Sequence, residues 1–323
     1  MSIHPDIAAF LELVAAGVTR GKRKSLHELA VAQARIDFDN SSLVIDHPPQ
    51  DLPHVEDVTI TVRDGATIAG RLYLPLNRAT SAPQPLLLYF HGGGYVVGGL
   101  DSHDSLCRSL AYRTPCAVLA VDYRRAPEHK FPIAVHDAID SLQWAFANAA
   151  TLGIDAGRIA VGGDSAGGTL ATVVALSSPE SQALAVQLLI YPCTSAYPHF
   201  ESHRRFAESP MLSATTLRWF YDHYLRSEAD RKDWRFAPLE IQKVTRVTPA
   251  HIVLGDHDPL VDEGQEYARK LQSFGVPVTV ALYAGMPHDF VRLGGIIPDE
   301  AARAHDEIAG VLARAFESTR PSP

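Results

Sequence analysis

Short apolar runs alternate with longer stretches of helical pattern between residues 86 and 282. The apolar runs have the length of buried strands and cover 86–90, 117–121, 159–161, 186–190, 252–254 and 278–282. Between most of them lie helical stretches at 105–111, 133–149, 169–176 and 263–274. Because crossover helices join parallel strands, this alternation predicts an α/β fold whose mostly parallel sheet is covered on both faces. In such a sheet, functional groups are expected at the carboxyl ends of the strands.

The segments outside this alternation have other patterns. Residues 1–40 show helical spacing of apolar residues, and three prolines near residue 50 then mark an extended passage. Two β-rich stretches, 58–62 and 68–75, flank an Asp64-Gly65 turn signal and predict an antiparallel pair at a sheet edge. Residues 194–236 are rich in polar and aromatic residues and show no clear strand, which predicts a helical cap. The predicted domains are N-terminal cap helices at 1–50, a core at 51–193 and 237–323, and a cap insertion at 194–236.

Composition argues against several kinds of partner. The formal net charge of -8 over 323 residues provides no basic field for nucleic acid or an anionic lipid surface. No apolar run approaches the roughly 18 residues of a membrane span, and the N-terminus lacks the basic region of a signal peptide. The three cysteines, Cys107, Cys116 and Cys193, lie in apolar segments and predict buried, reduced thiols. The expected location is therefore the cytoplasm, without stable membrane association.

The strongest signal for chemistry is GDSAGG at 163–168, which follows an apolar run and precedes a helical stretch. A strand, a sharp turn and a helix form the context of a nucleophile elbow, with Ser165 as the nucleophile. A Cβ at Gly163 or Gly167 would crowd this turn, and the helix adds free N–H groups near the reacting oxygen. The alternative is an ordinary glycine-rich loop, against which the other motifs argue.

A second glycine motif, HGGG at 91–94, directly follows the apolar run 86–90. Its backbone N–H groups can face an anion. We therefore predict an oxyanion hole formed by the N–H groups of Gly93, Gly94 and Ala166, each such donor being worth about 10²–10³ in rate. A phosphate loop is the alternative, but neither the GK[ST] sequence nor an acidic ribose ligand follows at the required place.

A general base and an acid must follow the serine, because the chain order in this fold class is serine, carboxylate, histidine. His288 lies in a turn just after the last apolar run and is predicted to be the base. Asp258 follows the run 252–254 and is predicted to orient it, with Asp256 as second choice. Asp262 and Glu263 fall in the first turn of the next helix, where carboxylates stabilise the helix dipole.

These motifs together resemble the hormone-sensitive lipase family of esterases, the bacterial family IV carboxylesterases. The resemblance covers nearly the whole chain up to His288. Its motifs are HGGG from His91, VDYRRAPEHKFP from Val121, GDSAGG from Gly163, LLIYP from Leu188, DPLVDEG from Asp258 and YAGMPHDF from Tyr283. It implies an α/β-hydrolase fold with an eight-stranded sheet, a cap made from the N-terminus and an insertion, and no cofactor. A metal is not expected, because neither an HExxH string nor paired His and Cys spacing occurs in the sequence. The resemblance also implies hydrolysis of esters with short to medium acyl chains, and it favours Asp258 over Asp256.

Two positions depart from the family pattern. Arg125 stands where an apolar residue is usual, and Asp289 stands where glycine usually follows the catalytic histidine. A carboxylate next to His288 is expected to raise the pKa of the imidazole and move the acid limb of the rate profile to higher pH. The polar stretch 122–132 is interpreted as a network that supports the oxyanion loop, with a solvated turn as the alternative. Its members are Asp122, Arg124 and Glu128.

The predicted function is a serine carboxylesterase acting on small, fairly apolar esters. Aromatic residues such as Tyr95 and Phe290 fit the wall of an apolar pocket, although core packing is the simpler explanation for most of the aromatics. Amidase or deacetylase activity by the same residues is one alternative. A non-catalytic ligand receptor is another, and the presence of His288 argues against it. The expected partner is a small ester, and an edge strand near Val278 allows a homodimer.

Overall fold

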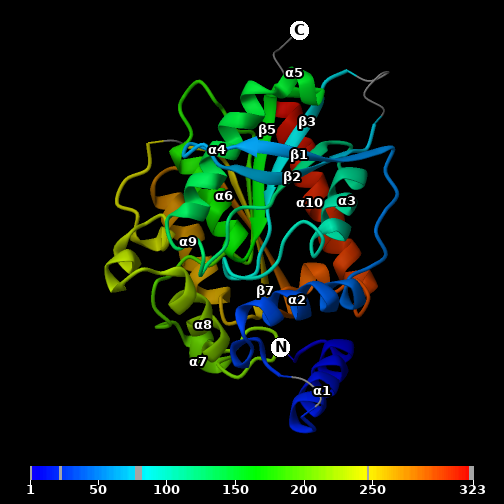
Figure 1. Cartoon of the computed structure of the whole chain (residues 1–323), viewed down its shortest axis with the longest axis vertical. Helices are drawn as coiled ribbons and strands as arrows, with labels where there is room; N and C mark the ends of the chain where they lie inside the picture. Colours follow the sequence, from blue (N-terminus) through cyan, green and yellow to red (C-terminus); the bar gives the residue numbers. More distant parts are fainter. Residues whose placement is uncertain (1, 22–23, 77–81, 246, 320–323) are drawn as a thin grey trace.

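The computed structural model describes residues 2–21, 24–76, 82–245 and 247–319 (Figure 1). At its centre lies one eight-stranded sheet with the strand order β1-β2-β4-β3-β5-β6-β7-β8. The pairs β1–β2 and β2–β4 are antiparallel, and all other neighbouring strands are parallel. The strands are β1 (His54–Thr61), β2 (Thr67–Leu74), β3 (Gln84–Phe90), β4 (Ala117–Val121), β5 (Ile154–Asp164), β6 (Gln187–Ile190), β7 (Ala250–His257) and β8 (Val278–Pro287).

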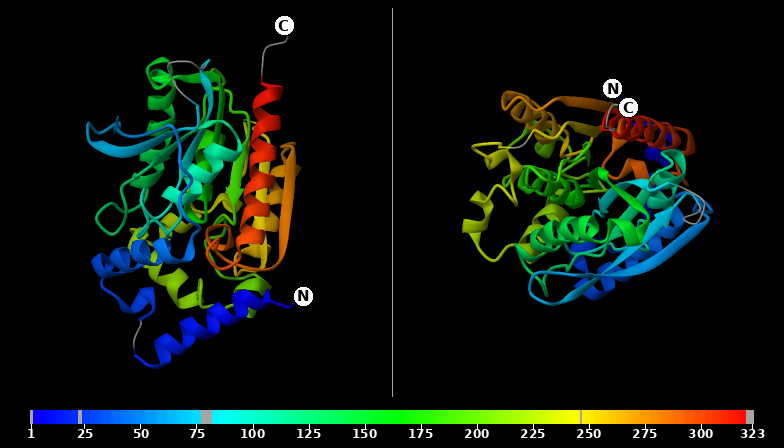
Figure 2. Two further views of the ribbon diagram at one scale, coloured as in Figure 1. Left: turned by 90° about the vertical axis from the view of Figure 1, so that its right-hand side faces the viewer. Right: turned by 90° about the horizontal axis from the view of Figure 1, so that it is seen from above.

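Helices cover both faces of this sheet (Figure 2). The helices α3 and α10 pack together on one face, whereas α4 and α6 pack on the other. The α-helices are α1 (Pro5–Thr19), α2 (Val31–Ile45), α3 (Asp104–Arg113), α4 (Ile133–Ala147), α5 (Ala149–Leu152), α6 (Ala166–Ser177), α7 (Glu201–Arg205), α8 (Ala214–Tyr224), α9 (Val261–Ser273) and α10 (Pro298–Ser318). Short 3-10 helices are η1 (Leu26–Glu28), η2 (Glu228–Lys232), η3 (Pro238–Glu240) and η4 (Phe290–Arg292). The predicted α/β class is confirmed.

The predicted elements are present, but several strands extend beyond the apolar runs that marked them, and one helix was not predicted. The antiparallel pair closes through the predicted turn, where the Val62 N–H donates to the carbonyl of Ala66 at 3.0 Å. Strand β5 starts at Ile154 instead of 159. The apolar run did not reveal this start, because residues 155–158 separate the buried Ile154 from it and are exposed or half-buried. The long helix α10 was not among the predicted elements. Its buried residues are Ala301, Ala304, His305, Ile308, Ala309, Leu312 and Phe316, and their spacing of three or four was the available signal.

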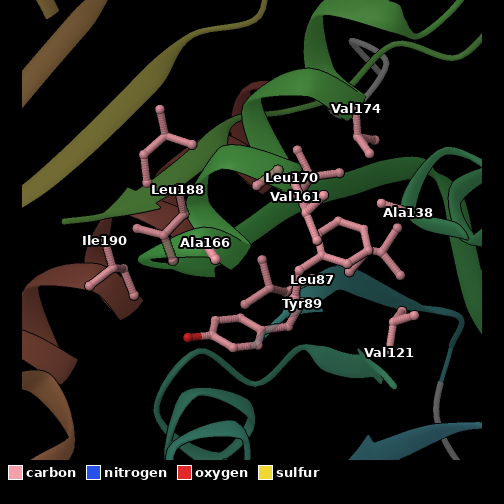
Figure 3. Close-up of a cluster of buried hydrophobic side chains, with 14 of the residues drawn as sticks. Leu87, Tyr89, Val121, Ala138, Val161, Ala166, Leu170, Val174, Leu188 and Ile190 are labelled. Atoms are coloured by element: carbon pink, nitrogen blue, oxygen red, sulfur yellow. The ribbon is translucent and has the colours of Figure 1, made fainter. Parts of the chain in front are cut away.

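A cluster of buried apolar side chains lies where β3 and β5 meet α6 (Figure 3). Leu87 and Val161 are fully buried on these strands, and Leu170 of α6 is fully buried beside them. Because helices remove both faces of the central strands from water, these strands are apolar without alternation. This packing fixes the carboxyl ends of β3 and β5, where the two glycine motifs begin.

The helices α1, α2, α7 and α8 gather at one end of the sheet (Figure 1). Arg35 of α2 donates to the carbonyl oxygens of Val96 and Ala126, each at 2.8 Å. Tyr224 of α8 stacks on Tyr95 with 3.9 Å between ring centroids. Both contacts join helices from the predicted cap segments to the loops after β3 and β4. The division into cap and core stays a prediction.

A helix that crosses a membrane must be both long and apolar. Within the described parts of the chain, no helix has the length and apolar composition needed to cross a bilayer.

Candidate active site

Ser165 lies in the turn between β5 and α6, in a backbone conformation that is rare for a residue with a side chain. Its φ is 53° and its ψ is -121°, and its N–H donates to the carbonyl of Ile190 at 2.8 Å. A Cβ at Gly163 or Gly167 would collide with the carbonyl oxygen of Phe90. The turn therefore requires glycine on both sides and holds the serine in a strained geometry.

The structure brings the three residues predicted as a triad into one hydrogen-bonded chain. His288 follows β8, and its Nε2 lies 3.1 Å from the Oγ of Ser165. Asp258 follows β7, and its Oδ2 lies 2.7 Å from the Nδ1 of His288. The Asp258 carboxylate is fully buried and also accepts from the N–H of Leu260 at 2.8 Å. With Nδ1–H donating to Asp258, Nε2 is the acceptor for the serine hydroxyl.

Burial and charge act in opposite directions on His288. Burial lowers the pKa of its imidazole, whereas the charge and hydrogen bond of Asp258 raise it, with a smaller contribution from Asp289. The result is a pKa above the ordinary value of 6.5. The carboxylate therefore stabilises the imidazolium that forms when the ring accepts a proton.

The other carboxylates near Asp258 have different partners. The Oδ1 of Asp256 lies 2.6 Å from the Nδ1 of His257 and accepts from the N–H of Gly285 at 2.6 Å. Asp262 accepts from the N–H of Ser202 at 2.8 Å. Glu263 accepts from the N–H of Thr194 at 2.5 Å. These groups anchor loops and the α7 segment, and the contact to His288 belongs to Asp258.

The predicted oxyanion residues lie where β3 and β5 end. Gly93 and Gly94 have φ values of 104° and 58°, which favour glycine. A Cβ at Gly93 would collide with the carbonyl of Val97, and one at Gly94 with the ring of Phe220. Ala166 is the first residue of α6, so its N–H has no intrahelical acceptor. The role of these three N–H groups stays a prediction.

Asp164 is a site residue that sequence reasoning missed. It is 1% exposed and accepts from the hydroxyl of Tyr89 at 2.7 Å and from the N–H of Gly92 at 3.0 Å. His103 contacts the other carboxylate oxygen at 3.3 Å. Burial raises the pKa of Asp164, but the charge and hydrogen bond of His103, the charge of Arg292 and the hydrogen bond of Tyr89 together hold it below its ordinary value. A buried carboxylate thus braces the glycine loop, and its position beside the nucleophile was the only sequence signal.

The polar stretch after β4 supports the glycine loop through different contacts from those predicted. Arg125, noted only as a departure from the family pattern, donates to the carbonyl of Gly98 and lies 3.4 Å from Asp122. Glu128 pairs with Arg35 of α2, with 2.6 Å between Arg35 Nη2 and Glu128 Oε2, and Arg35 in turn donates to the carbonyl of Val96 after the glycine motif.

Arg124 contributes to another contact. It binds the buried Asp137 at 2.7 Å and Asp64 in the β1–β2 turn at 2.7 Å. The expectation that Arg124 supports the glycine loop is therefore wrong, because its two carboxylate partners hold it against α4 and the turn.

The cysteines are buried and free, as predicted. Cys193 has the most informative place, since its Sγ lies 3.7 Å from the Oγ of Ser165. Burial raises the pKa of this thiol, so it remains protonated. Within the described ranges, no group of three or more His, Cys, Asp or Glu side chains could hold a metal ion.

A mostly parallel eight-stranded sheet with a serine elbow, and with a carboxylate and a histidine after its last two strands, defines an α/β hydrolase. Comparison with known families agrees. The α/β-hydrolase fold family matches residues 87–292, and the chain belongs to this family. The chain is a hydrolase, and its resemblance to the hormone-sensitive lipase esterases is confirmed.

Relatives span nearly the full length of the chain. The ethyl acetate hydrolase of Pseudomonas putida is 44% identical over 302 residues, which cover 93% of this chain and 95% of the relative. Carboxylesterase NlhH of Mycobacterium tuberculosis is 36% identical over 280 residues, covering 84% and 86%.

Solved structures show the same similarity. An ester-hydrolase from the metagenome of Lake Arreo, complexed with a bipyridine phosphonate derivative, has a TM-score of 0.92 and 36% identity, covering 98% of this chain and 99% of its own. The hyperthermophilic esterase of the archaeon Pyrobaculum calidifontis has a TM-score of 0.89 and 33% identity, covering 99% and 100%.

Proposed function

We propose that the protein is a carboxylesterase that hydrolyses esters with short to medium acyl chains through an acyl-enzyme on Ser165. The hydrogen-bonded chain Asp258–His288–Ser165 is the observation that carries this proposal. The names of the relatives support an ester as substrate, and that of the Pseudomonas putida relative supports small acyl and alcohol groups.

Acylation uses only groups of the chain and the ester. The Oγ of Ser165 attacks the carbonyl carbon while its proton passes to the Nε2 of His288. The N–H groups of Gly93, Gly94 and Ala166 bind the oxyanion of the tetrahedral intermediate. When the carbon–oxygen bond to the leaving group breaks, the imidazolium returns the proton to that oxygen, and the alcohol departs.

Deacylation repeats these steps with water as the nucleophile. His288 accepts a proton from the water that attacks the acyl-enzyme, and it then protonates Ser165 as the acid departs. Throughout, Asp258 holds the ring in the tautomer that leaves Nε2 free. Each proton that His288 accepts is returned within the same half-reaction.

The position of α8 supports the proposed preference for short acyl chains. Phe220 lies against Gly94, and the neighbouring Tyr221 contacts Cys193 beside the nucleophile. Both residues are only 5% exposed. Two bulky aromatic rings next to the reacting atoms leave little room for a long chain, and they offer an apolar surface to a small one.

The test is hydrolysis of p-nitrophenyl acetate, butyrate, octanoate and palmitate by wild type and by Ser165→Ala. We expect activity that falls with chain length and that drops by about 10⁴ or more in the variant. Ser141→Ala, which alters a buried serine of α4, is the matched control and keeps the activity. Wild type that cleaves p-nitroacetanilide but none of the esters would replace the esterase proposal with an amidase.

A further inference from the structure

Arg292 joins three segments that surround the candidate active site. Its side chain is 1% exposed and lies in η4, four residues after His288. One nitrogen, Nη1, contacts both carboxylate oxygens of Asp289 at 3.2 and 2.9 Å. The other, Nη2, donates to the Oγ of Ser42 in α2 at 2.6 Å and to the carbonyl of Ser102 at 2.8 Å. The guanidinium also lies 5.1 Å from the ring of Phe38 in α2.

Asp289 is held beside the base by this arginine and by a tyrosine. Its backbone φ is 68°, a conformation that costs a residue with a side chain about 1 kcal/mol relative to glycine. Its Oδ1 accepts from the hydroxyl of Tyr191 at 3.4 Å, and the Tyr191 ring lies 4.8 Å from that of His288. An acidic residue with an unfavourable backbone conformation is therefore kept next to the imidazole, at a position where glycine would fit without that cost.

The charge of Asp289 acts on His288, and the cation of Arg292 opposes it. Asp289 is one of the groups that raise the pKa of His288. Arg292 lies within 3 Å of that carboxylate, so it cancels part of its field at the imidazole. Several other ionisable groups face the pair. They are Asp46 at the end of α2, His103 before α3, Asp164 at the end of β5, Tyr191 after β6 and Asp258 after β7.

We propose that Arg292 is a positioning residue, which neutralises Asp289 beside His288 and ties the histidine loop to α2 and to the segment after the glycine motif. Two of its bonds reach Ser42 and Ser102, which lie far from it in sequence. Movement of α2 or of the 99–103 segment would therefore displace the loop that carries His288. The kinetic consequences rest on the proposed esterase function, whereas the effect on the titration of His288 requires no turnover.

The experiment titrates the His288 imidazole by NMR with 15N-labelled histidine, the His288→Gln spectrum assigning its signal. In Arg292→Gln, Asp289 loses its counter-ion, and we expect the titration to move up by on the order of half a pH unit. The double variant Asp289→Asn/Arg292→Gln should return to within a small fraction of that shift. Asp289→Asn alone should move the titration down. The acid limb of kcat/KM for p-nitrophenyl acetate should follow the same order.

Arg292→Lys separates charge from geometry, because lysine keeps the cation but has a single nitrogen, which cannot contact Asp289 and also reach Ser42 and Ser102. We expect its His288 titration to match wild type and its kcat to fall about tenfold, with a smaller change in KM. Arg124→Gln is the matched control, since it also leaves a buried carboxylate, Asp137, without its arginine. It should lower the thermal midpoint without moving the His288 titration.

Several outcomes would overturn the proposal. They are an unmoved titration in Arg292→Gln, failure of Asp289→Asn to restore it, and wild-type kcat in Arg292→Lys. If Arg292→Gln does not fold, the double variant decides, because it also removes the unpaired charge of Asp289. Its His288 titration should match that of wild type. A shift as large as that expected for Arg292→Gln counts against the proposal. Failure of the esterase function appears separately, as wild type that does not hydrolyse the ester while the titrations behave as expected.

Discussion

Asp258 and His288 show how one buried contact controls a side chain. The carboxylate fixes the ring tautomer through the 2.7 Å bond to Nδ1. Burial lowers the pKa of the imidazole, but the charge and hydrogen bond of Asp258, together with the charges of Asp289 and Asp164, raise it above the ordinary value. Asn at position 258 keeps the volume but loses the charge and lets the ring adopt the other tautomer. We therefore predict that Asp258→Asn lowers kcat for p-nitrophenyl acetate by about 10³–10⁴ at neutral pH.

The control for this prediction is the neighbouring carboxylate. Asp256 accepts from the N–H of Gly285 and has no contact to His288 among the hydrogen bonds of the described residues. Asp256→Asn should therefore lower kcat less than about tenfold. Equal losses in the two variants would show that the role assigned to Asp258 is wrong.

Burial also controls the reactivity of the three thiols. Burial raises the pKa of Cys107, Cys116 and Cys193, and each side chain is 5% exposed or less. A protonated thiol without solvent access does not react with a disulfide reagent. We predict that none of the three reacts with Ellman's reagent at mildly alkaline pH in the folded protein, and that all three react in guanidinium chloride. A thiol that reacts before unfolding would contradict the burial of that cysteine.

At the scale of secondary-structure elements, the glycine loop and α8 depend on each other. Gly94 has a φ of 58°, and a Cβ there would collide with the ring of Phe220. We predict that Gly94→Ala lowers kcat/KM by about 10² because the loop and α8 move apart. Adding Phe220→Ala should restore part of the loss, since it removes the ring that the new methyl group meets. The measurement is kcat/KM for p-nitrophenyl butyrate in the single and double variants.

Gly275 supplies the control for backbone strain. Its φ is 81°, and nothing lies within 4 Å of an added Cβ. Gly275→Ala therefore introduces the unfavourable conformation without a collision, at a cost of about 1 kcal/mol in stability and none in activity. If the double variant recovers nothing, strain alone explains the loss at Gly94, and the contact with Phe220 is irrelevant.

The elements that sequence predicted are those whose signal is local. Buried parallel strands leave continuous apolar runs, and the serine elbow needs glycines at fixed spacing, so both could be read from the chain. The roles of Asp164, Arg125 and Arg292 could not. Ser42 and Arg292 are 250 residues apart, and only the assembled fold brings them within hydrogen-bond distance. Single charged residues without periodicity give no signal of the partner that burial will provide.

At the scale of the whole molecule, buried histidines make stability depend on pH. His305 of α10 lies 2.8 Å from the Oγ of Ser109 in α3, and its other ring nitrogen lies 2.9 Å from the carbonyl of Val291. Burial lowers the pKa of this imidazole to about 4, against 6.5 for an ordinary histidine. Above pH 6.5 neither the folded nor the unfolded state binds the proton, so this histidine does not lower the free energy of unfolding.

As the pH falls from 6.5 towards 4, the unfolded chain gains a proton that the folded protein excludes. We predict that this site lowers the free energy of unfolding by up to about 3 kcal/mol across that window. Urea unfolding at several pH values measures it. His305→Gln should be less stable at neutral pH but should lose less on acidification, whereas His54→Gln, on the surface, should behave as wild type. An identical pH slope in His305→Gln would show that the lost stability comes from other groups.

The free edge of the sheet bears on assembly. Strand β8 is the last in the strand order, and Val280 and Leu282 on it are 43% and 52% exposed, although their neighbours Ala281 and Tyr283 are buried. An apolar edge strand with unpaired backbone groups can pair with another copy. We predict a homodimer with the two β8 strands side by side, seen by light scattering as twice the mass of the chain. Leu282→Lys should give a monomer, whereas Leu76→Lys, at a similarly exposed leucine outside β8, should not. A wild-type monomer at micromolar concentration would show instead that β8 does not pair with a second copy.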